Sequence, residues 1–324
     1  MDDRTEILPG DPPCVVTHRY ALVNGVRLHY VEAEPPAGAV PKGTAKVCLA
    51  LHGFPEFWYS WRHQLPALAA AGFRALAPDL RGYNLSDKPP GVANYRLDHL
   101  VGDVAGLIRA AGRGRAAVVG HDWGGVLAWA VAMQHPDLVE RLIVLNAPHP
   151  AAMLRELRTP AQLRKSWYVF FFQLPRLPEW VFRRGDFALL ERTLRRDPIR
   201  PGVFTEEDIR LYKEALAQPG VLTAAINWYR AIFRRGLYRV RREVRPVAAP
   251  TLLIWGEQDR YLGPRLLEGL EPWVPNLHIE RFPDASHWVH AEWPERVNRL
   301  MIDFLRGAIP FRGHAAVRSA AWLD

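Results

Sequence analysis

A short segment near the middle of the chain, residues 118–125 (VVGHDWGG), constrains the fold more than any other part of the sequence. Apolar, partly β-branched residues precede it, and residues 126–134 can form a helix after it. Asp122 stands between Gly120 and Gly124, a pattern typical of a strand that turns sharply into a helix and presents its central side chain. A strand ending in a glycine turn with a helix-capping aspartate is a less favoured alternative, so the interpretation depends on the rest of the chain.

Short apolar runs and helical spacings alternate on both sides of this segment. Residues 20–31 alternate around Asn24-Gly25, which predicts a β-hairpin. The runs predict buried strands at residues 47–51 and 142–145, and further strands at residues 74–77, 251–255 and 277–282. Helices are predicted at residues 61–71, 98–111 and 295–305. Strands that alternate with helices predict an α/β fold with a mostly parallel sheet.

The alternation is interrupted between residues 148 and 245. This stretch is rich in arginine and aromatic residues, is broken by prolines, and contains no short apolar strand flanked by turns. We therefore predict a helical cap at residues 148–245, inserted between two parts of one α/β core at residues 1–147 and 246–324.

Composition narrows the possible partners and the compartment. The net charge is +8, but the basic residues are scattered and no run of five like charges occurs, so we expect no nucleic-acid partner. No run of about 18 apolar residues occurs, so we expect no membrane span. The start of the chain lacks a signal-peptide pattern, and Cys14 and Cys48 lack metal-ligand spacing. We therefore expect a cytoplasmic protein with no metal or organic cofactor.

A carboxylate at the strand-to-helix turn indicates a particular reaction. A hydroxyl nucleophile that attacked a saturated carbon would form an ether, which water does not readily cleave. The carboxylate of Asp122 would form an ester instead, which water can hydrolyse to regenerate the enzyme. Asp122 therefore predicts substitution at an alkyl carbon followed by ester hydrolysis.

Hydrolysis of that ester requires a base and a group that orients it. His287 follows the last predicted strand, and a histidine titrates near neutral pH; His290 is the nearest rival. Asp259 follows the strand at residues 251–255, with Glu257 as the alternative acid. The backbone N–H groups of Phe54, after the strand at residues 47–51, and of Trp123 are the expected oxyanion hole.

With these residues identified, the chain resembles the soluble epoxide hydrolases of the α/β-hydrolase superfamily, from about His18 to Phe304. The segments HGFP at residues 52–55, GHDWGG at residues 120–125 and SHW at residues 286–288 match those of the family. These segments are shared with haloalkane dehalogenases. The resemblance implies a small-molecule epoxide substrate, and it implies that His52, Pro55, Trp167 and Trp288 line the substrate pocket.

The predicted cap distinguishes epoxide hydrolases from haloalkane dehalogenases better than these shared segments do. Epoxide hydrolases use two cap tyrosines to hydrogen-bond the epoxide oxygen, and the matching segments here place Tyr168 and Tyr229 at these positions. Haloalkane dehalogenases commonly have asparagine where Phe54 stands, although Trp123 and Trp167 could supply indole donors. We therefore expect an epoxide hydrolase, with a haloalkane dehalogenase or a non-catalytic ligand-binding protein of the same fold as alternatives. The oligomeric state is not predicted.

Overall fold

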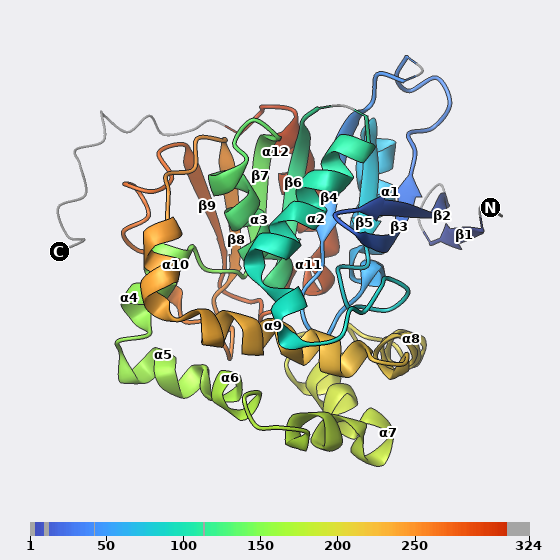
Figure 1. Ribbon diagram of the computed structural model, residues 1–324. Helices are drawn as coiled ribbons and strands as arrows, with labels where there is room; N and C mark the ends of the chain where they lie inside the picture. Colours follow the sequence, from blue (N-terminus) through green and yellow to red (C-terminus); the bar gives the residue numbers. More distant parts are fainter. Residues whose placement is uncertain (1–3, 10–12, 42, 113, 310–324) are drawn as a thin grey trace.

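The computed structural model describes residues 4–9, 13–41, 43–112 and 114–309 (Figure 1). These residues contain a nine-stranded sheet with the order β1-β2-β3-β5-β4-β6-β7-β8-β9. The neighbouring pairs β1–β2, β2–β3 and β3–β5 are antiparallel. Every following pair in this order, from β5–β4 to β8–β9, is parallel. The strands are β1 (Thr5–Leu8), β2 (Cys14–Val23), β3 (Val26–Ala33), β4 (Lys46–Leu51), β5 (Phe73–Pro78), β6 (Ala116–His121), β7 (Val139–Leu145), β8 (Thr251–Gly256) and β9 (Leu277–Phe282). The predicted α/β fold with a mostly parallel sheet is confirmed.

The predicted hairpin and strands are all present, and one strand was not predicted. Asn24 and Gly25 join β2 to β3 with φ angles of 48° and 76°, which is why a small or amide side chain is needed there. The additional strand is β1, in which only Leu8 is buried. Its short sequence has no clear alternation, so nothing in the pattern distinguished it from a loop.

Helices cover both faces of the sheet. The core helices are α1 (Gln64–Ala70), α2 (Leu97–Ala110), α3 (Trp123–Gln134), α11 (Val289–Glu292) and α12 (Pro294–Leu305), with 3₁₀ turns η1 (Trp58–Trp61), η2 (Val92–Tyr95) and η3 (Pro264–Leu267). The helix predicted at residues 61–71 therefore begins later than expected. Pro66 explains this, because its ring would clash with the carbonyl group four residues earlier in a longer helix.

The hydrophobic core has two halves, one on each face of the sheet. Val118 of β6 packs in the half that contains residues of α2 and α3. The next residue, Val119, packs in the half that contains residues of α1 and α12. Because successive side chains of a strand point to opposite faces, strands covered on both sides are apolar at every position. This accounts for the uninterrupted apolar runs of the central strands.

The residues between β7 and β8 form helices α4 to α10 and no strand, and their backbone is described throughout. They are α4 (Pro150–Glu156), α5 (Pro160–Lys165), α6 (Trp167–Phe171), α7 (Leu177–Arg196), α8 (Glu206–Ala217), α9 (Val221–Arg235) and α10 (Leu237–Glu243). Helices α5 to α9 lie across one end of the sheet (Figure 1). We call residues 148–245 the cap. The predicted second core part also included residues 310–324, which lie outside the described residues.

None of the helices in the described ranges is both long enough and apolar enough to cross a membrane.

Candidate active site

The turn between β6 and α3 holds Asp122 in a backbone conformation that non-glycine residues seldom adopt, with φ 51° and ψ −119°. The neighbouring glycines leave room for it. A Cβ atom on Gly120 would lie 2.2 Å from the carbonyl oxygen of Gly124, and a Cβ atom on Gly124 would lie 2.0 Å from that of Leu51. Both positions therefore require glycine, as the sequence pattern predicted.

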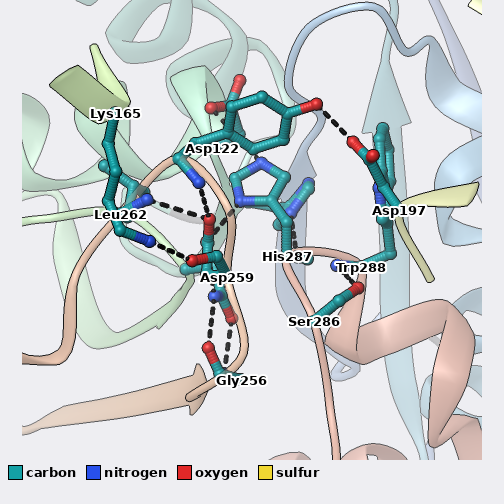
Figure 2. Close-up of polar contacts among 12 residues, drawn as sticks. Asp122, Lys165, Asp197, Gly256, Asp259, Leu262, Ser286, His287 and Trp288 are labelled. Atoms are coloured by element: carbon teal, nitrogen blue, oxygen red, sulfur yellow. Dashed lines mark hydrogen bonds and ion pairs between the residues drawn. The ribbon is translucent and has the colours of Figure 1, made fainter. Parts of the chain in front are cut away.

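Three predicted residues meet at the carboxyl ends of the parallel strands (Figure 2). Asp259 follows β8 and His287 follows β9, which is paired with β8. His287 Nδ1 lies 2.6 Å from Asp259 Oδ2, and His287 Nε2 lies 3.6 Å from Asp122 Oδ2. The two alternatives lie elsewhere, because Glu257 pairs with Arg281 and His290 lies beside Glu56.

Asp259 is held by several donors, one of which the sequence analysis had passed over. The backbone N–H groups of Tyr261 and Leu262 donate to its Oδ1 atom over 2.7 and 2.9 Å. Asn146, which follows β7, donates from Nδ2 to its Oδ2 atom over 2.8 Å and accepts a bond from the Gly256 amide. Asn146 carries no carboxylate, so a search of the sequence for the orienting acid does not select it. Its place at the end of a parallel strand was the signal that it belongs to the site.

The charges of this group shift its pKa values. Burial favours the neutral carboxyl of Asp259, but the His287 ring and the surrounding hydrogen bonds outweigh burial, so the pKa of Asp259 is lowered. Burial likewise favours a neutral His287 ring. The charges and hydrogen bonds of Asp259 and Asp122 outweigh it and raise the pKa of His287 well above its ordinary value.

The other oxygen of Asp122 contacts the predicted oxyanion hole. The backbone N–H of Phe54 donates to Asp122 Oδ1 over 2.9 Å. Trp123 is the first residue of α3, so its N–H belongs to the helix terminus that has no intrahelical acceptor. The Phe54 side chain is apolar and packs against Tyr229, with ring centroids 5.5 Å apart.

The predicted cap tyrosines lie close to each other and to Asp122. Tyr168 on α6 and Tyr229 on α9 have ring centroids 5.9 Å apart, and the Tyr229 ring lies 4.9 Å from that of Trp123. Burial and the negative charge of Asp122 raise the pKa of both phenols. Both side chains therefore remain hydrogen-bond donors at neutral pH.

The four residues expected to line the pocket lie in three different environments. Pro55 and Trp288 are buried beside the site. His52 is fully buried and uses both ring nitrogens on backbone groups, with Nδ1 2.9 Å from Gly53 O and Nε2 accepting the Leu80 amide over 3.0 Å. It therefore positions loops rather than offering a polar atom to a ligand. Trp167 is 62% exposed and lies on the outside of the cap.

A cap contact beside His287 was also missed from the sequence. The Tyr261 hydroxyl donates to Asp197, which follows α7, and the Tyr261 ring lies 5.4 Å from that of His287 and 5.6 Å from that of Tyr168. Tyr261 comes two residues after Asp259, which was the available signal. Its partner in the cap could not be found, because Tyr261 and Asp197 are 64 positions apart in the sequence.

Glu56, His121 and His290 form the one buried group, among the described residues, whose ligand atoms are close enough to share a metal ion, within 4.8 Å. Hydrogen bonds already join them to the site. His121 Nδ1 lies 2.9 Å from Glu56, and His121 Nε2 lies 2.9 Å from the backbone oxygen of His287. The group therefore supports the backbone that carries His287.

Comparison with known proteins places the chain among enzymes of one fold. A family model described as the alpha/beta hydrolase fold matches residues 47–294. The AB hydrolase superfamily protein YfhM of Bacillus subtilis is 42% identical over 289 residues, which cover 89% of this chain and 97% of that protein. Mouse epoxide hydrolase 4 is 37% identical over 302 residues, which cover 91% of this chain and 81% of that protein. A crystal structure of a mutant epoxide hydrolase from Bacillus megaterium superposes with a TM-score of 0.80 at 34% identity, covering 89% of this chain and all of that one.

Proposed function

The chain belongs to the α/β-hydrolase fold family, and we propose that it is an epoxide hydrolase, which converts an epoxide and water to a vicinal diol. One observation carries the proposal: a carboxylate nucleophile, Asp122, lies near two neutral phenols on the cap, Tyr168 and Tyr229. Nucleophilic attack on an epoxide needs both an anion at carbon and a proton donor at oxygen. The epoxide hydrolases among its relatives and structural neighbours support the same activity.

In the proposed first step, Asp122 Oδ2 attacks a carbon of the epoxide ring, and the bond from that carbon to the ring oxygen breaks. The Phe54 N–H holds the other carboxylate oxygen, Oδ1, which becomes the carbonyl oxygen of the ester. Negative charge develops on the epoxide oxygen. Tyr168 and Tyr229 hydrogen-bond this oxygen, and one of them supplies the proton that completes the hydroxyl group.

In the proposed second step, His287 takes a proton from water while the water oxygen attacks Cγ of the ester. Oδ1 becomes the oxyanion, stabilised by the N–H groups of Phe54 and Trp123. The bond between Cγ and Oδ2 then breaks, and Oδ2 leaves as a hydroxyl group of the diol after accepting the proton from His287. The second proton of the water leaves the new carboxyl group of Asp122 and restores the phenol that protonated the epoxide oxygen, so that the carboxylate and both tyrosines are regenerated. Asp259 orients His287 and stabilises its charged form, as their 2.6 Å contact supports.

The surroundings of Asp122 favour an epoxide over a haloalkane. A departing halide needs hydrogen-bond donors, and the side chain at the position that commonly carries asparagine in the dehalogenases is the apolar ring of Phe54. Of the two indoles considered as halide donors, Trp167 lies on the exposed surface of the cap and Trp123 lies at the site beside Tyr229, so one indole donor remains. A binding protein without catalysis would not need a nucleophile, a base and two proton donors together.

The proposed cytoplasmic location is supported by the two cysteines. Cys14 and Cys48 are free thiols in the structure, as is usual in a reducing compartment.

The test is to trap the ester. Changing His287→Gln should leave alkylation possible and block hydrolysis, so one substrate mass should be added to the protein after mixing with an epoxide such as styrene oxide. Intact-protein mass spectrometry measures this directly. The double variant Asp122→Ala with His287→Gln is the control and should stay unmodified. An unmodified His287→Gln protein, across a panel of epoxides that the wild type hydrolyses, would rule out His287 as the water-activating base.

A further inference from the structure

The outer side of the cap exposes an unusual number of large apolar side chains. Six of them are between 42% and 62% exposed: Trp167, Phe170, Leu174, Leu177, Trp180 and Phe233. The first five fall within one segment that runs from α6 into α7, and Phe233 joins them because its ring lies 5.9 Å from that of Phe170. We call these six residues the outer apolar face. Large exposed apolar patches mark interaction sites more often than chance.

Spacing within each helix explains part of this arrangement. Trp167 and Phe170 are three residues apart on α6, and Leu177 and Trp180 are three residues apart on α7, the interval at which side chains of a helix fall on the same face; Leu174 lies in the turn between the two helices. Phe172 and Phe182 are buried and Tyr168 lies beside the site, whereas Pro175 and Arg176 in the turn between the helices are exposed. Helices α6 and α7 lie at the edge of the molecule farthest from the sheet (Figure 1).

Positive charge surrounds the outer apolar face. Five exposed arginines accompany it: Arg164, Arg176, Arg183, Arg184 and Arg234. Between residues 161 and 184 the one acidic residue is Glu179, which pairs with Arg230 over 2.7 Å. The guanidinium of Arg184 lies 5.3 Å from the centre of the Trp180 ring. The face thus combines aromatic groups with unneutralised cationic groups.

A basic recess continues the positive charge past the end of α9. It has a volume of about 750 Å³, and its charged lining consists of four arginines and one carboxylate: Arg96, Arg234, Arg235, Arg242 and Glu243. Arg96 pairs with Asp98 and Arg235 pairs with Glu243, which reduces the excess of positive charge but does not remove it. Arg234 follows Phe233 of the outer apolar face directly in sequence. The recess and the apolar face therefore meet at the last turn of α9.

We propose that the outer apolar face docks onto the surface of an anionic lipid bilayer. Tryptophan and phenylalanine prefer the headgroup region of a membrane, and arginine pairs with lipid phosphates. A symmetric dimer is a poorer fit, because its interface would bring this arginine-rich face against itself. Docking would also place α6, which carries Tyr168, next to the bilayer. If the proposed epoxide hydrolase activity holds, lipophilic epoxides dissolved in the membrane are then the substrate class.

The experiment is co-sedimentation of the full chain with vesicles, which does not depend on catalysis. We expect binding to vesicles of phosphatidylcholine mixed with phosphatidylglycerol, and much less binding to phosphatidylcholine alone or at high salt. The double variant Phe170→Ser with Trp180→Ser should reduce the bound fraction at least tenfold, and so should Arg164→Glu with Arg183→Glu.

Matched controls carry the same changes in the core, away from the outer apolar face. Leu22→Ser with Ile7→Ser removes two exposed apolar groups of the β1–β2 region, and Arg109→Glu with Arg299→Glu reverses two exposed charges of the core. Circular dichroism verifies that each variant is folded, and both controls should bind like the wild type. The proposal is overturned if the wild type stays in the supernatant, if the controls lose as much binding as the cap variants, or if Phe170→Ser with Trp180→Ser dissolves a dimer instead.

Discussion

His287 has a carboxylate on each side of its ring, so the chemical state of Asp122 controls how readily the ring holds a proton. In the free enzyme the charges of Asp259 and Asp122 raise the pKa of His287 above its ordinary value. Ester formation would remove the charge of Asp122 and leave that of Asp259. The pKa of His287 should therefore fall at the point in the proposed cycle where a base is needed.

The variant Asp122→Asn imitates this loss of charge, and we expect His287 to titrate at lower pH in the variant than in the wild type. Nitrogen NMR of the imidazole ring across a pH series measures the difference. Because the folded-state pKa is raised, the charged ring contributes stability that is fully present below the unfolded value of about 6.5 and is lost as pH rises through the folded pKa. Asp122→Asn should therefore reduce the free energy of unfolding more at low pH than at high pH. If His287 titrates at the same pH in the variant and in the wild type, Asp122 does not influence the pKa of the ring.

Among the individual site residues, those that directly follow a strand could be predicted from the sequence. Those whose role depends on a contact with a distant part of the chain were missed. Asp122, Asp259 and His287 could be found because each comes after a predicted strand, and parallel strands end at one edge of the sheet. Asn146 stood in an equally good position but lacked the expected carboxylate. The contact between Tyr261 and Asp197 joins a core loop to the cap, and no local pattern encodes such a contact.

Two separate helices of the cap each bring one tyrosine to Asp122. The turn at α6 exposes Trp167 and directs Tyr168 inward, whereas α9 is buried along most of its length and carries Tyr229. Since the two phenols reach the site from different elements, the loss of one leaves the other in place. Their contributions to ring opening should therefore be partly redundant.

We expect Tyr168→Phe and Tyr229→Phe, made singly, to slow alkylation only in part, and the double variant to slow it far more. A lost oxyanion donor costs typically about 2.7–4 kcal/mol, or roughly a hundredfold to a thousandfold in rate. Ester hydrolysis should change little, because it does not use the phenols. Stopped-flow kinetics separates the two steps, and Tyr212→Phe, another buried cap tyrosine, is the control. Near-normal alkylation in the double variant would assign both tyrosines to packing.

Elements with strong periodicity were predicted with nearly correct bounds, and weak ones were not. The strands β4 to β8 are largely buried on both faces, so their apolar runs were unambiguous. The cap was recognisable as helical from the loss of that pattern. The arrangement of its helices depends on long-range contacts, such as the bond from Trp228 of α9 to the Arg81 carbonyl, which no spacing along the chain reveals.

In the molecule as a whole, the cap and the core meet at the loop that carries Asp259. From the cap, Lys165 donates to the backbone oxygen of Asp259 over 2.6 Å, and Gln162 donates to that of Tyr261 over 2.8 Å. Asp197 accepts from the Tyr261 hydroxyl, and burial together with Asp197 raises the pKa of this phenol, so it remains a donor. We therefore expect a movement of the cap to shift Asp259, the acid that orients His287.

We predict that Tyr261→Phe loosens the cap over the site and lowers kcat/KM about tenfold to a hundredfold, because a hydrogen bond to a charged group is worth about 1.5–3 kcal/mol. Hydrogen exchange should quicken in α5 and α6, which a local packing defect beside His287 would not cause. Arg260→Gln is the matched control. It removes the other contact of Asp197, a bond of 3.0 Å from a side chain that is 61% exposed, and such pairs contribute at most about 1 kcal/mol. If both variants lose the same activity with unchanged exchange in α5 and α6, the Tyr261–Asp197 bond does not couple the cap to the catalytic residues.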